Sequence, residues 1–499
     1  MLFTSADFLF IYLPIVLGVY FLGARLAGRG LAAAWLALAS FVFYGVWSPR
    51  YTLLLAASIA FNYVAGAMIQ NATERRPGSG RPILVVAVAA NLLTLAYFKY
   101  ANFFLESIAF ATSRPALVLD IILPIGISFF TFTQIAYLVD SHHGKVRERN
   151  PVHYALFVTY FPHLIAGPVL HHAEMMPQFR RPSTYVASLD SFTIGFAFVA
   201  MGMAKKVLLA DSAAPYANEI FDAHDFSVIS TGQAWAAALA YTLQIYFDFS
   251  GYSDMAVGLS LLFGVRLPYN FASPYKSLNI VDFWRRWHMT LSRFLRDYLY
   301  ISLGGNRKGP TRRYVNLATT MLLGGLWHGA SWTFVVWGAL HGMYLVINHF
   351  WAHVTSGIRS RSTLLRRPGV RALGRACSLA LTLVSVIVAW VFFREESLAG
   401  ATELVQRMFW FHPAYGTGPT YPPTIWIWIA AGFAVALLAR NSQELIDGCL
   451  SPFVARLSAS GLAGAMFNAL LLGMLIASIV VLAFISASRD VSEFIYFNF

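Results

Sequence analysis

The run Met321-Leu-Leu-Gly-Gly-Leu-Trp-His328-Gly-Ala-Ser-Trp332 places an ionisable side chain inside sequence that is apolar enough for a membrane interior. Upstream, the run Phe283-Trp-Arg-Arg-Trp-His288 carries a second histidine among aromatic residues. A titratable group at bilayer depth is energetically costly, so it indicates a functional site by default. His328 and His288 are therefore the first candidate functional residues.

The composition around these motifs is that of a membrane protein. Of the 499 residues, 58% are hydrophobic and only 12% are charged, and the mean hydropathy is +0.60. Soluble domains carry about 25% charged residues, and a spanning helix needs about 20 apolar residues. The sequence predicts an all-α polytopic membrane protein and excludes most water-soluble enzymes.

Apolar segments recur along the whole chain, and they lie at 7–24, 31–47, 51–70, 82–98, 118–139, 152–170, 190–210, 233–264, 316–335, 335–352, 373–393, 424–440 and 462–486. We expect roughly 11 to 13 spans plus re-entrant pieces. Pro162, His163, Gly167 and Pro168 interrupt the segment 152–170, which predicts a broken or re-entrant element shielded by protein. No internal repeat is found, which weakens the hypothesis of a transporter built from inverted repeats.

Basic residues in the short loops predict the orientation. The loops after the first and third segments carry five arginines, against Arg50 alone in the loop between them. These five are Arg25, Arg29, Arg75, Arg76 and Arg81. The loop Ser141–Asn150 and the stretch 355–375 are also basic and fall on the same, cytoplasmic side. Both termini are then expected outside the cytoplasm, and residues Met1 to Asp7 lack the features of a cleaved signal peptide.

The formal net charge of +13 fits basic loops that face anionic membrane lipid, so no nucleic-acid partner is predicted. No metal site is predicted either. Cys377 and Cys449 have no metal-ligand or disulfide spacing. The adjacent pairs His142-His143 and His171-His172 would diverge on a helix.

Asp248 and Asp254 lie in a mostly apolar segment. Two interpretations stay open for these carboxylates. They cap helices or pair with buried arginine, or they orient histidines and line a substrate path.

The segment 282–300 is too charged to face lipid and is expected at the interface or within the protein. At helical spacing it pairs Asp282 with Arg286, and Arg293 with Asp297.

As one helix, this segment would put His288, Ser292 and Arg296 on one face. It leads into the basic turn Gly304-Gly-Asn-Arg-Lys-Gly309, whose backbone N–H groups suit a phosphate. A plain cytoplasmic loop explains the turn equally well.

Gly324, Gly325 and Gly329 flank His328 and allow close helix packing, which does not explain the histidine itself. His341 lies about 220° further round a continuous helix and is expected to face elsewhere.

Six stretches, in the same order along most of the chain, resemble the membrane-bound O-acyltransferase (MBOAT) family, in the branch of the bacterial alginate O-acetyltransferase membrane subunit. They are Leu123-Pro-Ile-Gly-Ile-Ser-Phe-Phe130, Phe161-Pro-His-Leu-Ile-Ala-Gly-Pro168, Tyr246-Phe-Asp-Phe-Ser-Gly-Tyr-Ser-Asp254, Phe283-Trp-Arg-Arg-Trp-His288, Arg296-Asp-Tyr-Leu-Tyr-Ile-Ser-Leu-Gly-Gly-Asn-Arg307 and Gly325-Leu-Trp-His-Gly-Ala330. The resemblance implies a bacterial inner-membrane enzyme whose domain covers residues 1–486. Its helices would form a ring around a central tunnel. It also implies that His328 is catalytic and that His288 is the second active-site histidine.

The implied chemistry suits an imidazole. A hydroxyl that attacks an acyl thioester must lose its proton, and imidazole accepts protons near neutral pH. The thioester donor is expected to be acetyl-CoA, with an acyl carrier protein as its rival, and no bound cofactor is expected. The candidate donor-binding cations are Arg285, Arg286, Arg293, Arg307 and Lys308. Further candidates along the tunnel are Asp248, Asp254, Ser292, Asn306 and Trp327.

The chain ends in Phe494-Ile-Tyr-Phe-Asn-Phe499, within a tail at 487–499 that the charge rule places outside. An aromatic tail can anchor at the membrane interface. It also resembles the C-terminal hexapeptide of the accessory protein of teichoic-acid D-alanylation, which implies that Tyr496 carries the acyl group. An extracytoplasmic serine esterase-like (SGNH) partner would then pass the acyl group to an exported polysaccharide such as alginate.

Three alternatives remain at this point. The first is an enzyme that transfers another acyl group, such as D-alanine, to an envelope polymer. The second is a transporter in which His328 and Asp248 line the permeation path. A third alternative is a non-catalytic scaffold of a secretion complex.

Overall fold

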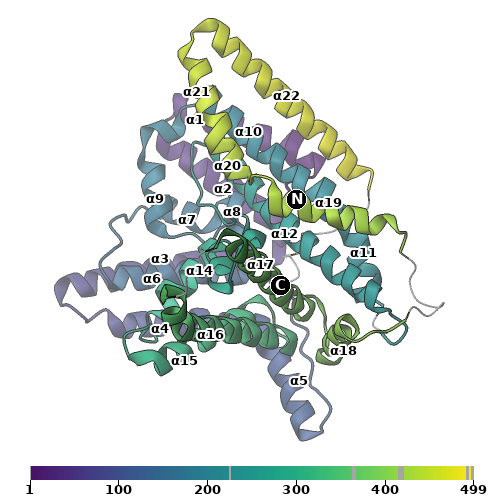
Figure 1. Ribbon diagram of the computed structural model, residues 1–499. Coiled ribbons are helices and arrows are strands. Elements are labelled where there is room, and N and C mark those ends of the chain that lie inside the picture. Colours follow the sequence, from purple (N-terminus) through teal and green to yellow (C-terminus); the bar gives the residue numbers. More distant parts are fainter. Residues whose placement is uncertain (1, 224–225, 362–366, 414–420, 490–493, 496–499) are drawn as a thin grey trace. The chain divides into compact units, whose positions relative to one another are not determined.

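The structure is a computed structural model that describes residues 2–223, 226–361, 367–413, 421–489 and 494–495 (Figure 1). All regular elements in these residues are helical, and no strand occurs among them. Seven helices are long and apolar enough to cross a membrane, or eight if one bent pair counts as a single span. The prediction of an all-α polytopic membrane protein is confirmed.

The α-helices are α1 (Leu13–Leu26), α2 (Arg29–Trp47), α3 (Pro49–Arg75), α4 (Arg81–Leu95), α5 (Ala101–Thr112), α6 (Ile127–His142), α7 (Pro151–Thr159), α8 (Phe161–Leu164), α9 (His172–Arg180), α10 (Leu189–Ala204), α11 (Asp211–Phe221), α12 (Thr231–Leu262), α13 (Ile280–Trp284), α14 (Met289–Phe294), α15 (Gly309–His328), α16 (Trp332–Arg361), α17 (Pro368–Arg394), α18 (Leu398–Phe409), α19 (Thr424–Leu438), α20 (Ser442–Leu445), α21 (Ser451–Ala459) and α22 (Leu462–Ala487).

The expected number of roughly 11 to 13 spans included apolar segments that the structure breaks into shorter helices. It also included segments that are not among the seven candidate membrane-spanning helices. The long helices α12, α15 and α16 are not among them. In the segment 152–170, α7 ends at Thr159 and the four-residue α8 follows after Tyr160, with nearly every side chain buried. The predicted break at the prolines and glycine of this segment is confirmed.

The chain divides into two compact units that interleave along the sequence. The first comprises residues up to Val207, Gly251–Tyr269 and the chain from Ser442 onward. The second comprises Leu208–Ser250 and Asn270–Asn441. The boundary cuts through α12, whose residues up to Ser250 belong to the second unit and whose residues from Gly251 belong to the first.

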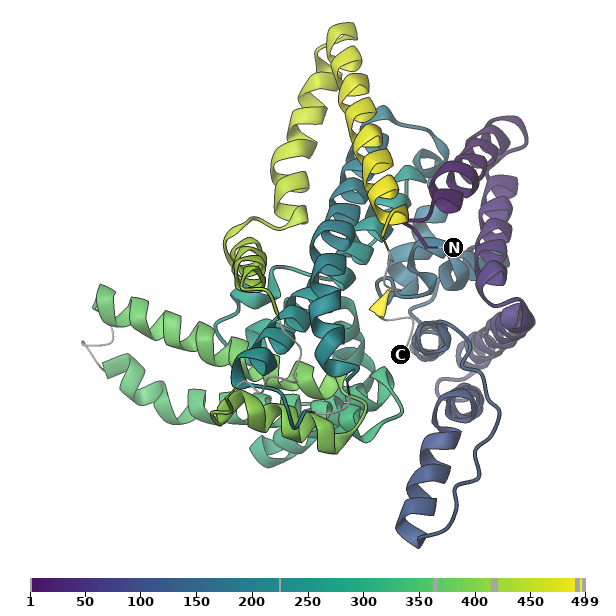
Figure 2. The same cartoon turned by 90° about the vertical axis from the view of Figure 1, so that its right-hand side faces the viewer.

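In the first unit, α21 and α22 form a hairpin at the yellow end of the colour scale (Figure 2). α22 also packs against α10. Asn62 of α3 and Asn91 of α4 exchange amide hydrogen bonds of 2.7 and 3.0 Å in the apolar interior. Each amide thereby satisfies the polar group of the other, as burial away from water requires.

The second unit is organised around α15 and α16, which run side by side after a three-residue link (Figure 1). Glycines line their contact. A Cβ atom added to Gly325 would lie 2.2 Å from the carbonyl oxygen of Phe334, and one added to Gly338 would lie 2.5 Å from that of Met321. Only residues without a side chain allow two backbones this close. The predicted packing role of the glycines beside His328 is confirmed at Gly325.

Candidate active site

His328 is the last residue of α15, directly before the link to α16, and only 3% of its surface is exposed. Three aromatic rings surround its imidazole edge-on. Their centroids lie 4.9 Å (Trp327), 5.0 Å (Trp337) and 5.2 Å (Phe393) from the imidazole centroid. The packing holds the imidazole in a largely apolar environment.

His288 is fully buried and stands just before α14, in a left-handed backbone conformation with φ of 41°. That conformation costs a non-glycine residue about 1–2 kcal/mol, so the surroundings must enforce it. Asn270 provides the constraint. Its backbone carbonyl accepts from the Met289 N–H at 2.9 Å, and its side-chain Oδ1 lies 3.1 Å from Nδ1 of His288.

The hydrogen bonds of Asn270 fix the tautomer of His288. Oδ1 of Asn270 also accepts from the backbone N–H of Thr290 at 3.3 Å and from the Thr290 hydroxyl at 2.7 Å. A backbone N–H can only donate, so the amide atom it meets is the oxygen. Nδ1 of His288 must therefore carry the proton, which leaves Nε2 as the nitrogen with the lone pair.

Both predicted histidines contact one indole. The ring centroid of Trp327 lies 6.2 Å from His288 and 4.9 Å from His328. Trp327, a candidate by sequence, is itself buried. The structure thus brings two histidines that are far apart in the sequence to the same side chain, within one compact unit.

His341 is a third buried histidine of this cluster, and the helical-wheel argument placed it wrongly. α15 ends at His328 and α16 starts at Trp332, so the two histidines are on different helices. Trp337 contacts both, with centroids 5.0 Å from His328 and 4.8 Å from His341. Nδ1 of His341 accepts from the indole N–H of Trp284 at 3.3 Å, and its Nε2 has no hydrogen-bond partner among the described residues.

The segment 282–300 is not one helix, which corrects the predicted shared face of His288, Ser292 and Arg296. α13 ends at Trp284, His288 lies outside any helix, and α14 begins at Met289. The Ser292 hydroxyl donates to the Trp287 carbonyl at 3.4 Å, and Arg296 is bonded to the neighbouring Asp297.

The cations of this segment differ in their exposure and partners. The predicted pair of Arg286 with Asp282 is confirmed, at 3.0 Å, and Arg286 also donates to the Ala272 carbonyl. Arg285 is exposed, whereas Arg293 is partly buried.

The basic turn before α15 exposes Asn306, Arg307 and Lys308. Positive φ angles of 106° at Gly304 and 56° at Gly305 shape it. The Asn316 side chain donates to the Gly305 carbonyl at 2.9 Å and fixes the turn on α15.

The two carboxylates of α12 fall in different units. Asp248 is buried in the second unit. In the first unit, Oδ2 of Asp254 binds Nζ of Lys205 at 2.6 Å and the Ser442 hydroxyl at 2.5 Å. Asp254 thus forms an ion pair, as one of the two interpretations of the sequence expected, but its partner is Lys205 and not a buried arginine.

Tyr496 lies outside the described residues. Phe494, the first residue of the same hexapeptide, is described and buried in the first unit. Its ring stacks on Tyr252 with centroids 4.4 Å apart, and Tyr252 stacks in turn on Phe3 at 4.8 Å.

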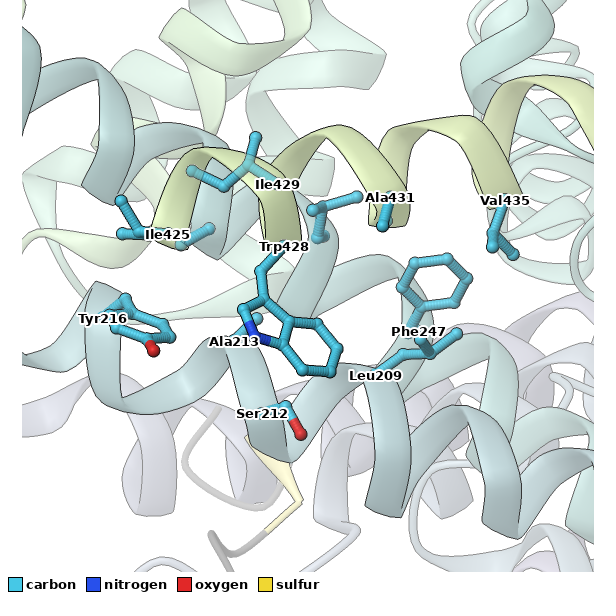
Figure 3. Close-up of a pocket in the computed structure, with 13 residues that line it drawn as sticks. Leu209, Ser212, Ala213, Tyr216, Phe247, Ile425, Trp428, Ile429, Ala431 and Val435 are labelled. Carbon is cyan, nitrogen blue, oxygen red and sulfur yellow. The ribbon is translucent and has the colours of Figure 1, made fainter. Parts of the chain in front are cut away.

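A separate cavity of about 80 Å³ in the second unit is lined mostly by aliphatic and aromatic side chains, from α11, α12, α19 and Leu209 just before α11 (Figure 3). Tyr216, Trp428 and Ser212 provide its few polar atoms, and no histidine or carboxylate lines it. It therefore lacks the groups needed for proton transfer. Among the described residues, no group of three metal-ligating side chains is found anywhere in the chain.

Residues 41–376 match the model of the membrane-bound O-acyltransferase (MBOAT) family, and the chain belongs to this family. It is therefore an O-acyltransferase, and the predicted family, enzyme class and multi-pass membrane character are confirmed.

Two relatives match about four fifths of the chain, and a third matches less than half of it. It is 46% identical over 417 residues to the probable alginate O-acetylase AlgI of Azotobacter vinelandii, a match covering 82% of this chain and 78% of the relative. It is 41% identical over 435 residues to the peptidoglycan O-acetyltransferase of Helicobacter pylori, covering 82% and 80%. A teichoic acid D-alanyltransferase of Bacillus subtilis is 27% identical over 239 residues, covering 45% and 59%.

Proposed function

We propose that the protein passes an acetyl group from a cytoplasmic thioester donor across the bacterial inner membrane, for O-acetylation of an extracytoplasmic or exported glycan. The observation that carries this proposal is the contact of His328 and His288 with the same buried indole, Trp327. Two relatives that match four fifths of the chain are named as O-acetylating enzymes, which favours acetyl over D-alanyl transfer. Family membership leaves the transporter and scaffold hypotheses without support.

In the proposed reaction, an acceptor hydroxyl attacks the thioester carbonyl carbon. His328 takes the hydroxyl proton as the new C–O bond forms, and gives it to the departing thiolate as the C–S bond breaks. A base positioned in this way contributes about 10²–10⁴-fold to a rate. His288 presents Nε2 as a hydrogen-bond acceptor, which suits it to orient the acceptor hydroxyl.

In our proposal the hydroxyl of Tyr496 is the first acceptor of the acetyl group. A serine esterase-like partner then moves the acetyl group from Tyr496 to the glycan. A phenol, with a pKa of about 10, loses its proton more readily than an alcohol. Burial of Phe494 against Tyr252 supports the proposal, because it anchors the start of the hexapeptide. The donor is acetyl-CoA or an acetylated carrier protein.

The test uses the purified full chain in nanodiscs with labelled acetyl-CoA, and mass spectrometry of the tail. We expect label on Tyr496 in the wild type and none in His328→Ala or Tyr496→Phe. His143→Ala, an exposed histidine outside the site, is the matched control. Turnover without label on Tyr496 would refute the tyrosine carrier, and full activity of His328→Ala would refute the assigned base.

If acetyl-CoA gives no reaction with any variant, the same assay is repeated with an acetylated carrier protein. Failure of both donors with the partner and glycan supplied would overturn the acetyl proposal. D-alanyl transfer under the same conditions would replace it.

A further inference from the structure

The first unit contains a hollow of about 530 Å³ that no step of the proposed reaction uses. It is lined by four arginines, Arg29, Arg147, Arg149 and Arg180, together with residues that include His153 and Tyr185. The arginines come from the start of α2, the loop before α7 and the end of α9. We call this site the basic hollow.

Three of its four guanidinium groups are available to a ligand. Arg149 is held in place, because it donates to Gln70 at 2.9 Å and to Asn71 at 3.0 Å and forms an ion pair with Glu74. The other three arginines are exposed, and within the described part of the chain their side chains make no ion pair or hydrogen bond.

Cations outnumber anions in the basic hollow. Its one carboxylate, Glu148, contacts Nδ1 of His153 and faces four arginines that line the same hollow. Burial raises the pKa of Tyr185 to about 12, against the opposing effect of Arg29, so its phenol is neutral at physiological pH. That phenol donates to the Phe179 carbonyl at 2.7 Å.

Two helices begin at the basic hollow. Gly30 lies in the first turn of α2, and Asn150 caps α7, and both line the hollow. The N-terminal end of a helix carries partial positive charge and favours anions. Arginine forks match the oxygen geometry of phosphate, and the volume lies in the range of small-ligand sites, about 300–1,000 Å³.

We propose that the basic hollow binds a phosphate-bearing anion, supplied either by the headgroup of an anionic phospholipid or by a soluble nucleotide carrier such as CoA. The loops that contribute Arg29 and Arg147 are those expected on the cytoplasmic side, where both sources occur. This inference does not rest on the proposed function, because binding is measured without turnover.

The test compares two triple variants of the full chain in phosphatidylcholine nanodiscs. One variant, Arg29→Gln, Arg147→Gln and Arg180→Gln, removes the available cations of the hollow. The control, Arg75→Gln, Arg76→Gln and Arg81→Gln, removes three exposed arginines around the α3–α4 loop, which is expected on the same side. The probes are phosphatidylglycerol, followed by native mass spectrometry, and CoA, followed by calorimetry.

For one of the probes we expect the hollow variant to bind at least about tenfold more weakly than the control, since each lost charged hydrogen bond contributes substantially. A selective loss of phosphatidylglycerol identifies a headgroup site, and a selective loss of CoA identifies a nucleotide site. The wild-type affinity should also fall as ionic strength rises. Equal binding of both probes by both variants, or an equal loss in the control, overturns the proposal.

Discussion

Oδ1 of Asn270 lies 3.1 Å from Nδ1 of His288, so a single amide fixes both the tautomer and the orientation of a buried imidazole. The same oxygen accepts from Thr290, and the backbone of Asn270 accepts from Met289. His288 is thus held at its ring, and at the two residues that follow it, by one residue that sequence patterns did not single out.

Replacing Asn270 should therefore impair catalysis through His288. We expect Asn270→Ala to lower kcat by about 2–13-fold, because a neutral hydrogen bond of about 0.5–1.5 kcal/mol that orients the imidazole is lost. Asn270→Asp keeps an acceptor and should retain more activity than the alanine variant. Initial rates with labelled donor give the comparison, and equal rates for Asn270→Ala and wild type would show that this contact is only structural.

His341 should act as a positioning residue through Trp284 and Trp337. We expect His341→Phe to keep the fold within about 1 kcal/mol, because it preserves aromatic packing and removes a buried N–H without a described partner. We expect kcat to fall about tenfold with little change in KM, because the indole of Trp284 loses its acceptor.

His341→Asn restores an acceptor near the position of Nδ1 and should recover part of the rate. If His341→Phe transfers acyl groups at the wild-type rate, then His341 serves only to fill the core. Measuring kcat, KM and the unfolding transition in detergent for the wild type and both variants separates a positioning role from a packing role.

The α15–α16 contact should tolerate no side chain at Gly325. We expect Gly325→Ala to destabilise the protein by about 1–3 kcal/mol, because its new Cβ would meet the backbone of Phe334 at 2.2 Å. Gly473→Ala on α22 is the control, since nothing lies within 4 Å of its new Cβ. Tryptophan fluorescence during thermal unfolding measures both, and a stable Gly325→Ala protein would contradict the packing account.

The buried ion pair of Lys205 and Asp254 should be needed for folding rather than for chemistry. Lys205→Met leaves the carboxylate of Asp254 without its cation and should cost about 3–5 kcal/mol. Adding Asp254→Asn to this variant should restore much of the stability and, with it, activity per folded molecule. An inactive but stable double variant would instead return Asp254 to the list of catalytic candidates.

The buried ring of Phe494 should be required for acylation of the tail, if Tyr496 is the carrier. We expect Phe494→Ala to reduce label on Tyr496 about tenfold or more, since truncating a buried phenylalanine costs about 3–5 kcal/mol of local packing. Phe110→Ala, at a ring that is 90% exposed, is the matched control. Wild-type labelling in Phe494→Ala would show that tail docking is unnecessary.

The sequence predicted the membrane class and the broken segment around Pro162, and it pointed to His328 and His288 as candidates, because composition and unusual residues carry those signals. The break at His288 was not predictable, since the helical spacing of Asp282 and Arg286 gives no sign of it and the cause is a tertiary contact with Asn270.

The position of His341 beside His328 was missed for a different reason. A helical wheel assumes one continuous helix, whereas Gly329–Ser331 separates two. A local signal was present, because the Ser331 hydroxyl accepts from the Thr333 N–H at 3.3 Å, as a serine at a helix start commonly does.

The left-handed backbone at His288 has a consequence for large variant libraries. A glycine at position 288 would adopt this positive φ without the steric cost that a residue with a side chain carries. A library screened for abundance in the membrane should therefore enrich glycine at position 288, whereas one screened for acylated product should enrich histidine. Divergence of the two enrichment profiles at a single codon would mark position 288 as one where selection keeps a conformationally unfavourable residue for its chemistry.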